Sequence, residues 1–241
     1  MDALIYTVMS GAERAMQAQQ VHANNLANLE TGGFRADMEL ARSQVVPGYG
    51  FDARHVSDIQ TNAVVTRAGA NRETGRDLDV AISGQGFFAV QGQQGEAYTR
   101  AGAFSLDAEG GLMVNGHPVL GDGGPITLPP FTRVAIAQDG TISIQPPGQQ
   151  TMQPVDKLKL VTAAPGSLTK NEAGLIVSRT GDPLPVDEKV QVQSGHLEGS
   201  NVSAIDEMVA TMTLNRDFEL QMKLYKAADS MAETGNRLIR E

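Results

Sequence analysis

Residues 22–35 read HANNLANLETGGFR, and this stretch decides the fold because it ends one long helix and turns the chain. Gly32 and Gly33 stop the helix, since glycine is the residue that helices most often use at their C-terminal turn. The asparagines of residues 24–28 can hydrogen-bond backbone groups near such an end, and Phe34 can anchor the departing chain to an apolar surface. The stretch therefore predicts a helix end followed by a turn.

The segment before this turn, residues 3–29, favours a helix of about seven turns. It contains no proline and six alanines, and it follows Asp2, a good N-cap residue. Glu13 and Arg14 are its only charged residues, and glutamine and asparagine occupy the face that charges would normally cover. Gly11 inside the helix costs about 1 kcal/mol relative to alanine, which indicates the close approach of another backbone. We predict a helix that packs against several neighbours.

A second long helix is predicted after Gly199. Ser203 provides an N-cap hydroxyl, and Asp206 and Glu207 are first-turn acids that complement the helix dipole. Asn201-Val202-Ser203 matches a glycosylation sequon, but helix capping explains it better. The apolar residues of the second half of the helix spread over roughly half of its circumference, which is wider than the roughly 100° stripe of a helix on one core. We therefore expect this helix also to contact more than one neighbour.

The sequence between the helical segments predicts an all-β domain over residues 76–199. Short β-type runs are separated by turns such as Asn115-Gly116 and Asp139-Gly140, which tolerate positive φ between strands. A sandwich or a partly open barrel follows from this pattern.

The chain as a whole is predicted to be α+β, with long helices at both ends and the all-β domain between them. Residues 31–75 show poor periodicity and are predicted to form an extended connector. Residues 1–30 and 200–241 are expected to pair with each other, and with other subunits, as a coiled-coil-like assembly region.

Composition excludes several classes of function. Nineteen basic and twenty-eight acidic residues give a net charge of -9, and the basic residues are scattered, so no nucleic-acid partner is expected. Cysteine is absent, which excludes disulfides, thiolate metal sites and cysteine nucleophiles. No run approaches the roughly 18 apolar residues of a membrane span, so no membrane insertion is expected.

The residue types that carry catalysis form no recognisable site in the sequence. Residues 84–89 formally fit the glycine fingerprint of dinucleotide sites, but a strand and turn stand where the phosphate-binding helix should begin. Asp77 and Asp79 lie on one strand beside Arg76, which favours a solvated strand edge over a catalytic pair. The histidines fall in separate segments: His22, His55, His117 and His196. We expect no catalytic residue, cofactor, metal or small-molecule substrate.

Three ordered parts of the sequence resemble the family of flagellar basal-body rod and hook proteins. Residues 22–35 are similar to the family's Asn-Asn-Leu-Ala-Asn and Thr-x-Gly-Phe signature. Residues 75–88, followed by Tyr98–Gly102, look like its β domain. Residues 197–202, with Glu207–Val209, look like its C-terminal segment.

Within this family, residues 1–6 and 218–223 are most similar to proximal rod proteins, and distal rod or hook-type axial proteins are the near alternative. The resemblance implies a structural subunit that assembles with itself and with other rod subunits, through its terminal helices, into the axial drive shaft of the flagellum. It also implies export by the flagellar type III apparatus without a cleaved signal peptide, and a place in the periplasmic rod. From the residues alone, a secreted β-domain enzyme and an adhesin or export partner with coiled ends remain open.

Assembly contacts are expected at the apolar and small residues of the two helices and in the turn after the first. In the first helix and its turn these residues are Leu4, Val8, Gly11, Ala15, Asn24, Asn25, Leu26, Asn28, Thr31, Gly33 and Phe34. In the second helix they are Ile205, Met208, Met212, Phe218, Leu224, Tyr225, Met231 and Ile239.

Overall fold

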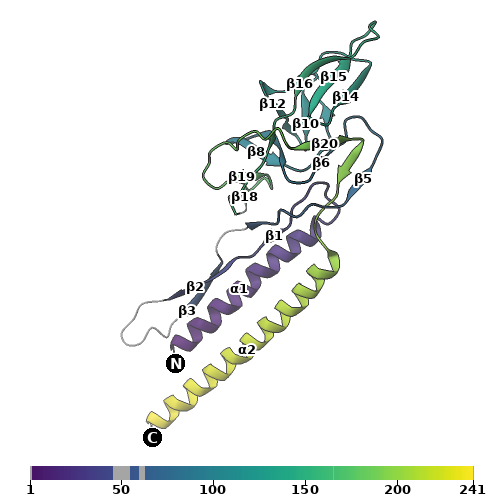
Figure 1. Cartoon of the computed structure of the whole chain (residues 1–241). Helices are drawn as coiled ribbons and strands as arrows, with labels where there is room; N and C mark the ends of the chain where they lie inside the picture. Colours follow the sequence, from purple (N-terminus) through teal and green to yellow (C-terminus); the bar gives the residue numbers. More distant parts are fainter. Residues whose placement is uncertain (1, 46–54, 60–62, 165, 241) are drawn as a thin grey trace. The chain divides into compact units, whose positions relative to one another are not determined.

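The computed structural model describes residues 2–45, 55–59, 63–164 and 166–240 (Figure 1). Part of the predicted connector, residues 46–54 and 60–62, thus lies outside the described residues. The architecture is α+β, with a helix at each end of the chain and a β-rich region between them, as the sequence predicts.

The chain divides into two compact units. The first unit combines Met1–Ala27, Asp37–Ala63 and Ser203–Glu241, and the second combines Asn28–Ala36 and Val64–Val202. Both terminal helices therefore belong to the first unit.

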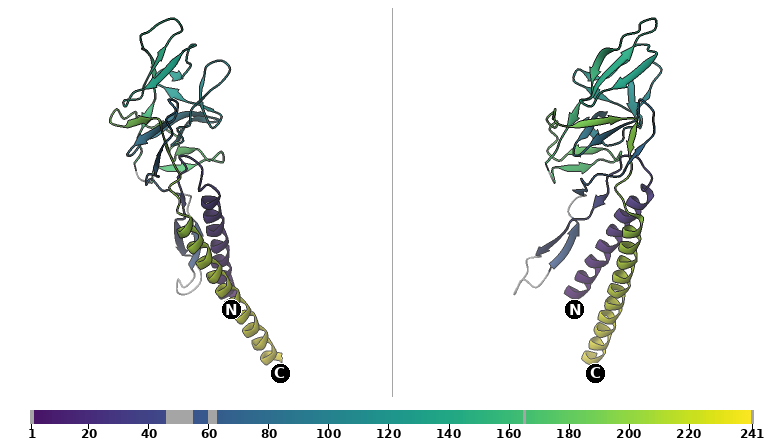
Figure 2. Two further views of the ribbon diagram at one scale, coloured as in Figure 1. Left: turned by 90° about the vertical axis from the view of Figure 1, so that its right-hand side faces the viewer. Right: turned by 45° about the vertical axis from the view of Figure 1, so that its right-hand side comes forward.

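In the first unit, α1 (Asp2–Ala27) and α2 (Ala204–Arg240) lie side by side (Figures 1 and 2). Strands β2 (Ala41–Val45) and β3 (His55–Ile59) form an antiparallel hairpin, and β3 packs against α1. The short strands β1 (Asp37–Met38) and β4 (Ala63–Val64) form a two-stranded sheet. Residues of the predicted connector thus form strands.

The facing sides of the two helices have a regular spacing. In α1 the least exposed positions recur every three or four residues: Val8, Gly11, Ala15, Ala18, His22 and Asn25. In α2 the corresponding positions are Glu207, Thr211, Leu214, Phe218, Gln221, Tyr225, Ala228 and Ala232. This spacing keeps one face of a helix against its neighbour over several turns.

Gly11 lies on this facing side of α1. A Cβ atom at Gly11 would stand 3.0–3.3 Å from the side-chain amide of Gln221 in α2, so a larger side chain would press on that amide. The sequence predicted that another backbone approaches Gly11, and this is wrong because the nearest atoms belong to a side chain. The prediction of tight packing at this position is confirmed.

The start of α2 follows the predicted cap. The backbone N–H of Asp206 donates to the Ser203 hydroxyl at 3.4 Å, and the N–H of Glu207 donates to the Ser203 carbonyl at 3.0 Å. The first bond satisfies one of the amide groups that a helix start leaves without partners, and the second is the first regular bond of the helix.

The second unit is built from short antiparallel strands. Its largest sheet has the order β17-β7-β8-β19-β18, and a second has the order β14-β15-β16. The bounds of these strands are β7 (Phe87–Gly92), β8 (Gly95–Thr99), β14 (Arg133–Ile136), β15 (Thr141–Gln145), β16 (Gln153–Lys157), β17 (Leu160–Val161), β18 (Leu168–Lys170) and β19 (Ile176–Ser178).

The remaining strands form smaller sheets. A three-stranded sheet has the order β11-β10-β9, and three strand pairs join β12 to β13, β20 to β6 and β21 to β5. Their bounds are β5 (Asn71–Glu73), β6 (Val80–Ser83), β9 (Ser105–Leu106), β10 (Leu112–Val114), β11 (His117–Pro118), β12 (Leu120–Gly121), β13 (Gly124–Pro125), β20 (Gln191–Ser194) and β21 (His196–Glu198). The strands described thus form several small sheets, where the sequence predicted one sandwich or barrel.

Strand β7 separates two hydrophobic cores. Phe88 and Val90 belong to the larger core, whereas Phe87 and Ala89 belong to the smaller one. Alternate residues of a strand point to opposite faces, so one fully buried strand serves both cores. In the larger core the Phe88 and Phe104 rings meet edge to face, with their centroids 5.2 Å apart.

Candidate functional site

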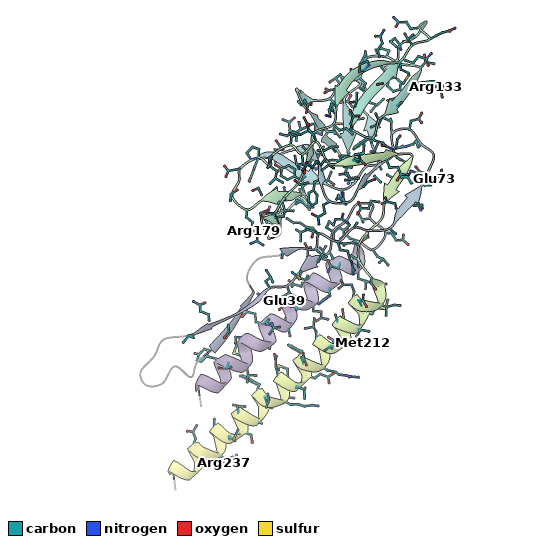
Figure 3. The ribbon with its side chains drawn as sticks, viewed as in Figure 1. Glu39, Glu73, Arg133, Arg179, Met212 and Arg237 are labelled. Atoms are coloured by element: carbon teal, nitrogen blue, oxygen red, sulfur yellow. The ribbon has the colours of Figure 1, made fainter. Side chains whose placement is uncertain are left out.

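The outward face of α2, which is the part of its surface that does not face α1, carries several exposed large apolar side chains. Ile205 is 75% exposed, Met212 is 69% exposed and Leu224 is 58% exposed. Met208 and Met231 are also exposed, and Figure 3 marks Met212 on α2. Ile205, Met208 and Met212 share one stripe at helical spacing, and Leu224 and Met231 share a second stripe on another side of the helix. Exposed apolar stripes of this kind are typical of protein interaction surfaces.

The wide apolar arc predicted for α2 consists of two edges with different environments. Phe218 and Tyr225 are half-buried and lie on the stripe that faces α1, together with Gln221. Leu224, next to Tyr225 in the sequence, is exposed on the other edge. One neighbour of α2 is therefore α1 of the same chain.

The predicted residues of α1 lie mostly on its inner side. Val8 and Ala15 are buried, and Leu26 is half-buried. The outer side of α1 exposes three large apolar residues that the sequence prediction did not name: Tyr6, Met9 and Met16. Nothing is described of the side chains of two further predicted residues, Leu4 and Ile239.

Asn25 forms hydrogen bonds that join the end of α1 to two other segments of the same unit. Its Nδ2 donates to the Asp37 carbonyl at 3.0 Å and to Glu207 Oε1 at 3.1 Å, and its Oδ1 accepts from the Asp37 N–H at 2.8 Å. Asn24 Nδ2 donates to Asp37 Oδ2 at 3.0 Å, and His22 Nδ1 contacts Glu207 Oε2. Because Asn25 is 1% exposed, its bonds are made within the chain.

The turn after α1 belongs to the second unit. The Thr31 N–H donates to the Asn28 carbonyl at 3.2 Å, and the Phe34 N–H donates to the Thr31 carbonyl at 3.2 Å. Gly33 has a φ of +70°, and a Cβ atom there would lie 2.2 Å from the backbone nitrogen of Ala101. Only glycine fits both this conformation and this close approach.

Phe34 was expected to rest on an apolar surface. In the structure, Lys170 Nζ lies 3.8 Å from the centroid of the half-buried ring, which is the geometry of a cation–π contact. The same ammonium group donates to the Arg35 carbonyl at 2.7 Å. Phe34 is therefore held by a charged residue of β18.

Three of the stretches that resemble the rod family meet at one buried ion cluster in the second unit. Arg35 Nη1 lies 2.6 Å from Glu198 Oε1, and Arg100 Nε lies 3.0 Å from Glu198 Oε2. All three side chains are 1% exposed or less. Glu198 Oε1 also accepts from the Gly69 N–H at 2.7 Å, and Arg100 Nη2 donates to the Gly84 carbonyl at 2.5 Å.

Burial changes the acidity of both arginines in this cluster. Loss of hydration lowers the pKa of Arg100 to about 10, although the Glu198 carboxylate opposes the shift. Burial likewise lowers the pKa of Arg35, again against the effect of Glu198. Both guanidinium groups stay charged near neutral pH, so the cluster carries one positive charge in excess.

Asn201 joins two further backbone segments in the second unit. Its Oδ1 accepts from the Ala36 N–H at 2.7 Å, and its Nδ2 donates to the carbonyls of Val65 and Arg67 at 3.1 and 2.9 Å. The sequence placed this residue in the family-like segment 197–202 and in a helix-capping stretch, but it did not predict these bonds.

The carboxylates weighed as a catalytic pair have different surroundings. Asp77 is exposed, whereas Asp79 is buried and forms an ion pair with Arg76, with Arg76 Nη2 2.7 Å from Asp79 Oδ1. The prediction of a solvated edge is therefore wrong for Asp79, because Arg76 replaces its water. Strand β7 begins at Phe87, where a dinucleotide site would require a helix.

Two features, a metal-binding cluster and a membrane-spanning helix, are absent from the described residues. No group of three or more histidine, aspartate or glutamate side chains in this part of the chain is arranged to hold a metal ion. No helix described is long and apolar enough to cross a membrane.

Comparison with known proteins gives consistent matches along the chain. The family model described as Flagella basal body rod protein matches residues 5–35. The model described as Flagellar hook protein FlgE/F/G D1 domain matches residues 81–144. The model described as Flagellar basal body rod FlgEFG protein C-terminal matches residues 193–238.

Rod proteins from several bacteria are similar to this chain over nearly their whole length. The flagellar basal-body rod proteins FlgF of Escherichia coli (strain K12) and of Salmonella typhimurium are each 38% identical to this chain, with 99% of both sequences covered. The rod protein FlgG of Agrobacterium fabrum is 33% identical, over 92% of this chain and 95% of its own. The chain described here is therefore a member of the flagellar basal-body rod protein family.

Proposed function

We propose that this chain is a structural subunit of the bacterial flagellar basal-body rod. The observation that carries the proposal is the exposed apolar face of α2, in a chain that resembles rod proteins from end to end. Large apolar side chains gain roughly 25 cal/mol for each Å² that is removed from water. Exposed stripes of such side chains are therefore best stabilised when neighbouring subunits cover them.

In this proposal the terminal segments, residues 1–30 and 200–241, form the assembly core, and residues 76–199 form a separate β domain joined by residues 31–75. The three- and four-residue spacing along α1 and α2 supports a coiled-coil-like pairing within the chain. Ile205, Met208, Met212, Leu224 and Met231 then contact other subunits.

Two residues of the turn after α1, Asn28 and Thr31, keep a smaller role. They shape the turn, and Gly33 and Phe34 join it to the β-rich unit. Asn24 and Asn25 act indirectly, because Asn25 bonds Glu207 in the first turn of α2 and Asn24 bonds Asp37 in β1. We propose that these residues present the assembly face without forming it.

The chain's place in the cell follows from the same proposal. Its partners are other proximal and distal rod proteins and the flagellar type III export apparatus, and it resides in the periplasmic rod without removal of a signal peptide. The higher identity to FlgF than to FlgG favours the proximal rod over the distal rod. A structural role requires no catalytic residue, cofactor, metal or substrate.

Substitution of Met212 tests the proposal. Met212→Glu should leave the thermal unfolding of the free subunit unchanged, because the residue is exposed there, but a carboxylate in a subunit contact should stop rod completion and motility. Gln94→Glu is the control, since it adds the same charge at an exposed position of the β-rich unit. Normal motility of a Met212→Glu strain would contradict the proposal.

A further inference from the structure

The buried ion cluster of the second unit is unbalanced in charge. Arg35 and Arg100 bring two positive charges, and Glu198 brings one negative charge. The Phe87 ring, whose centroid lies 5.9 Å from Arg100 Cζ, offers only a weak partner for the second charge. An unpaired charge in a protein interior is costly unless a counter-charge or water compensates it.

The same cluster leaves hydrogen-bond donors without acceptors. Arg35 Nε and Arg100 Nη1 are buried, and neither has a hydrogen-bond partner among the described residues. Buried donors are nearly always satisfied, so two such atoms in one cluster point to a bound group.

Both arginines of the cluster line one small pocket. It has a volume of about 30 Å³, and its walls include Arg35, Arg100, Phe87 and Gly86. Thr66 and Gln85, which are both exposed, also line it and bring a hydroxyl and an amide. This space suffices for one small ion or for one or two waters.

We propose that this pocket binds one monovalent anion of the size of chloride, held by Arg35 and Arg100 and reached past Thr66 and Gln85. Such an anion neutralises the excess charge and accepts from the two donors at once. A water molecule could accept from the donors but would leave the charge unbalanced. The anion thereby stabilises the junction of the three family-like stretches.

Thermal unfolding of the full chain in a series that replaces gluconate by chloride, at constant ionic strength, tests the proposal. Gluconate is monovalent but too bulky for the pocket, so the comparison separates specific binding from screening. Binding to the folded state alone should raise the Tm with the logarithm of the chloride concentration, by about 3–5 °C for each tenfold increase above its Kd. Equal Tm values in chloride and gluconate would overturn the proposal, and the pocket would then hold water.

The variant Gln85→Glu provides the second arm, because its carboxylate would stand at the mouth of the pocket and compete with chloride. Gln94→Glu is the matched control, with the same change of charge at an exposed position in the β7–β8 turn. Gln85→Glu should lose the chloride dependence, and Gln94→Glu should keep it. Equal chloride responses in the two variants would also overturn the proposal.

Bromide provides a test that does not depend on stability. Crystals of the unmodified protein soaked in bromide should show an anomalous peak within hydrogen-bond distance of Arg100 Nη1. Anomalous peaks at bromide sites elsewhere in the crystal, with no peak within hydrogen-bond distance of Arg100 Nη1, would contradict the assignment.

Discussion

At Glu198, a single carboxylate faces two guanidinium groups in the interior of the second unit. The exchange of such a pair for apolar residues can be neutral, but the removal of one partner leaves an uncompensated charge. Arg35 and Arg100 cannot reach bulk water, because both are almost fully buried. The fold of the β-rich unit therefore depends strongly on this one side chain.

Glu198→Gln should lower the free energy of unfolding of the β-rich unit by about 3–5 kcal/mol, because two buried positive charges would lose their anionic partner. Chemical denaturation of the purified subunit measures this change. Glu109→Gln removes an exposed carboxylate and should change the stability by at most about 0.5 kcal/mol. A Glu198→Gln effect as small as that of the control would contradict the importance of the cluster.

Tyr98 gives a second prediction at the residue scale. Burial raises the pKa of Tyr98 to about 12, from an ordinary value of 10.0, and its hydroxyl accepts from the Leu184 N–H at 2.7 Å. The folded state therefore holds this proton more tightly than the unfolded state. The stability that the neutral phenol contributes is complete below pH 10 and is lost as the pH rises from 10 through 12.

A spectrophotometric titration of the four tyrosines should accordingly show one late step near pH 12. Tyr98→Phe should abolish this step, and Tyr6→Phe should leave it in place. The wild type must be compared with Tyr98→Phe at each pH, because the lowered pKa of Arg100 shifts stability in the opposite direction between pH 10 and 12.5. A late step that persists in Tyr98→Phe would refute the assignment.

At the scale of the element, α2 has two faces with different tasks. Tyr225 faces α1, and Leu224 faces outward, although the two residues are adjacent. The sequence indicated that the apolar arc was too wide for one neighbour. Which edge faces α1 could not be read from it, because several apolar side chains on both edges are large and similar in hydrophobicity.

The adjacent substitutions Leu224→Glu and Tyr225→Glu separate these tasks. Tyr225→Glu should lower the free energy of unfolding of the helical unit in the free subunit by about 1–3 kcal/mol, because it places a carboxylate in the contact with α1. Leu224→Glu should leave that stability within about 0.5 kcal/mol of the wild type and should still block rod assembly. Circular dichroism melting and motility measure the two effects, and the opposite assignment of effects would show that the faces are exchanged.

At the scale of the whole molecule, sequence and structure agree most where local chemistry decides. The α+β class and both helices were predictable, and Ser203 caps the helix that follows it. The predicted role of Gly33 as the helix stop is wrong, because α1 already ends at Ala27 and Gly33 instead allows the close approach of Ala101. The cluster of Arg35, Arg100 and Glu198 was not predictable, since it depends on three distant segments meeting, and no local pattern marks a charge as buried. The sequence shows which residues are charged but not which of them form buried ion pairs.

In the proposed rod, neighbouring subunits cover the outward face of α2. The chain contains no cysteine, so Met212→Cys would introduce a single reactive thiol. A maleimide reagent should modify this thiol rapidly in the free subunit, where Met212 is exposed, and slowly in isolated basal bodies. Glu109→Cys, at an exposed position on the β-rich unit, is the control that shows whether the reagent reaches the assembly. Strong protection of Met212→Cys in basal bodies is the predicted result, and equally rapid labelling in both states, with the subunit present in the rod, would contradict the claim.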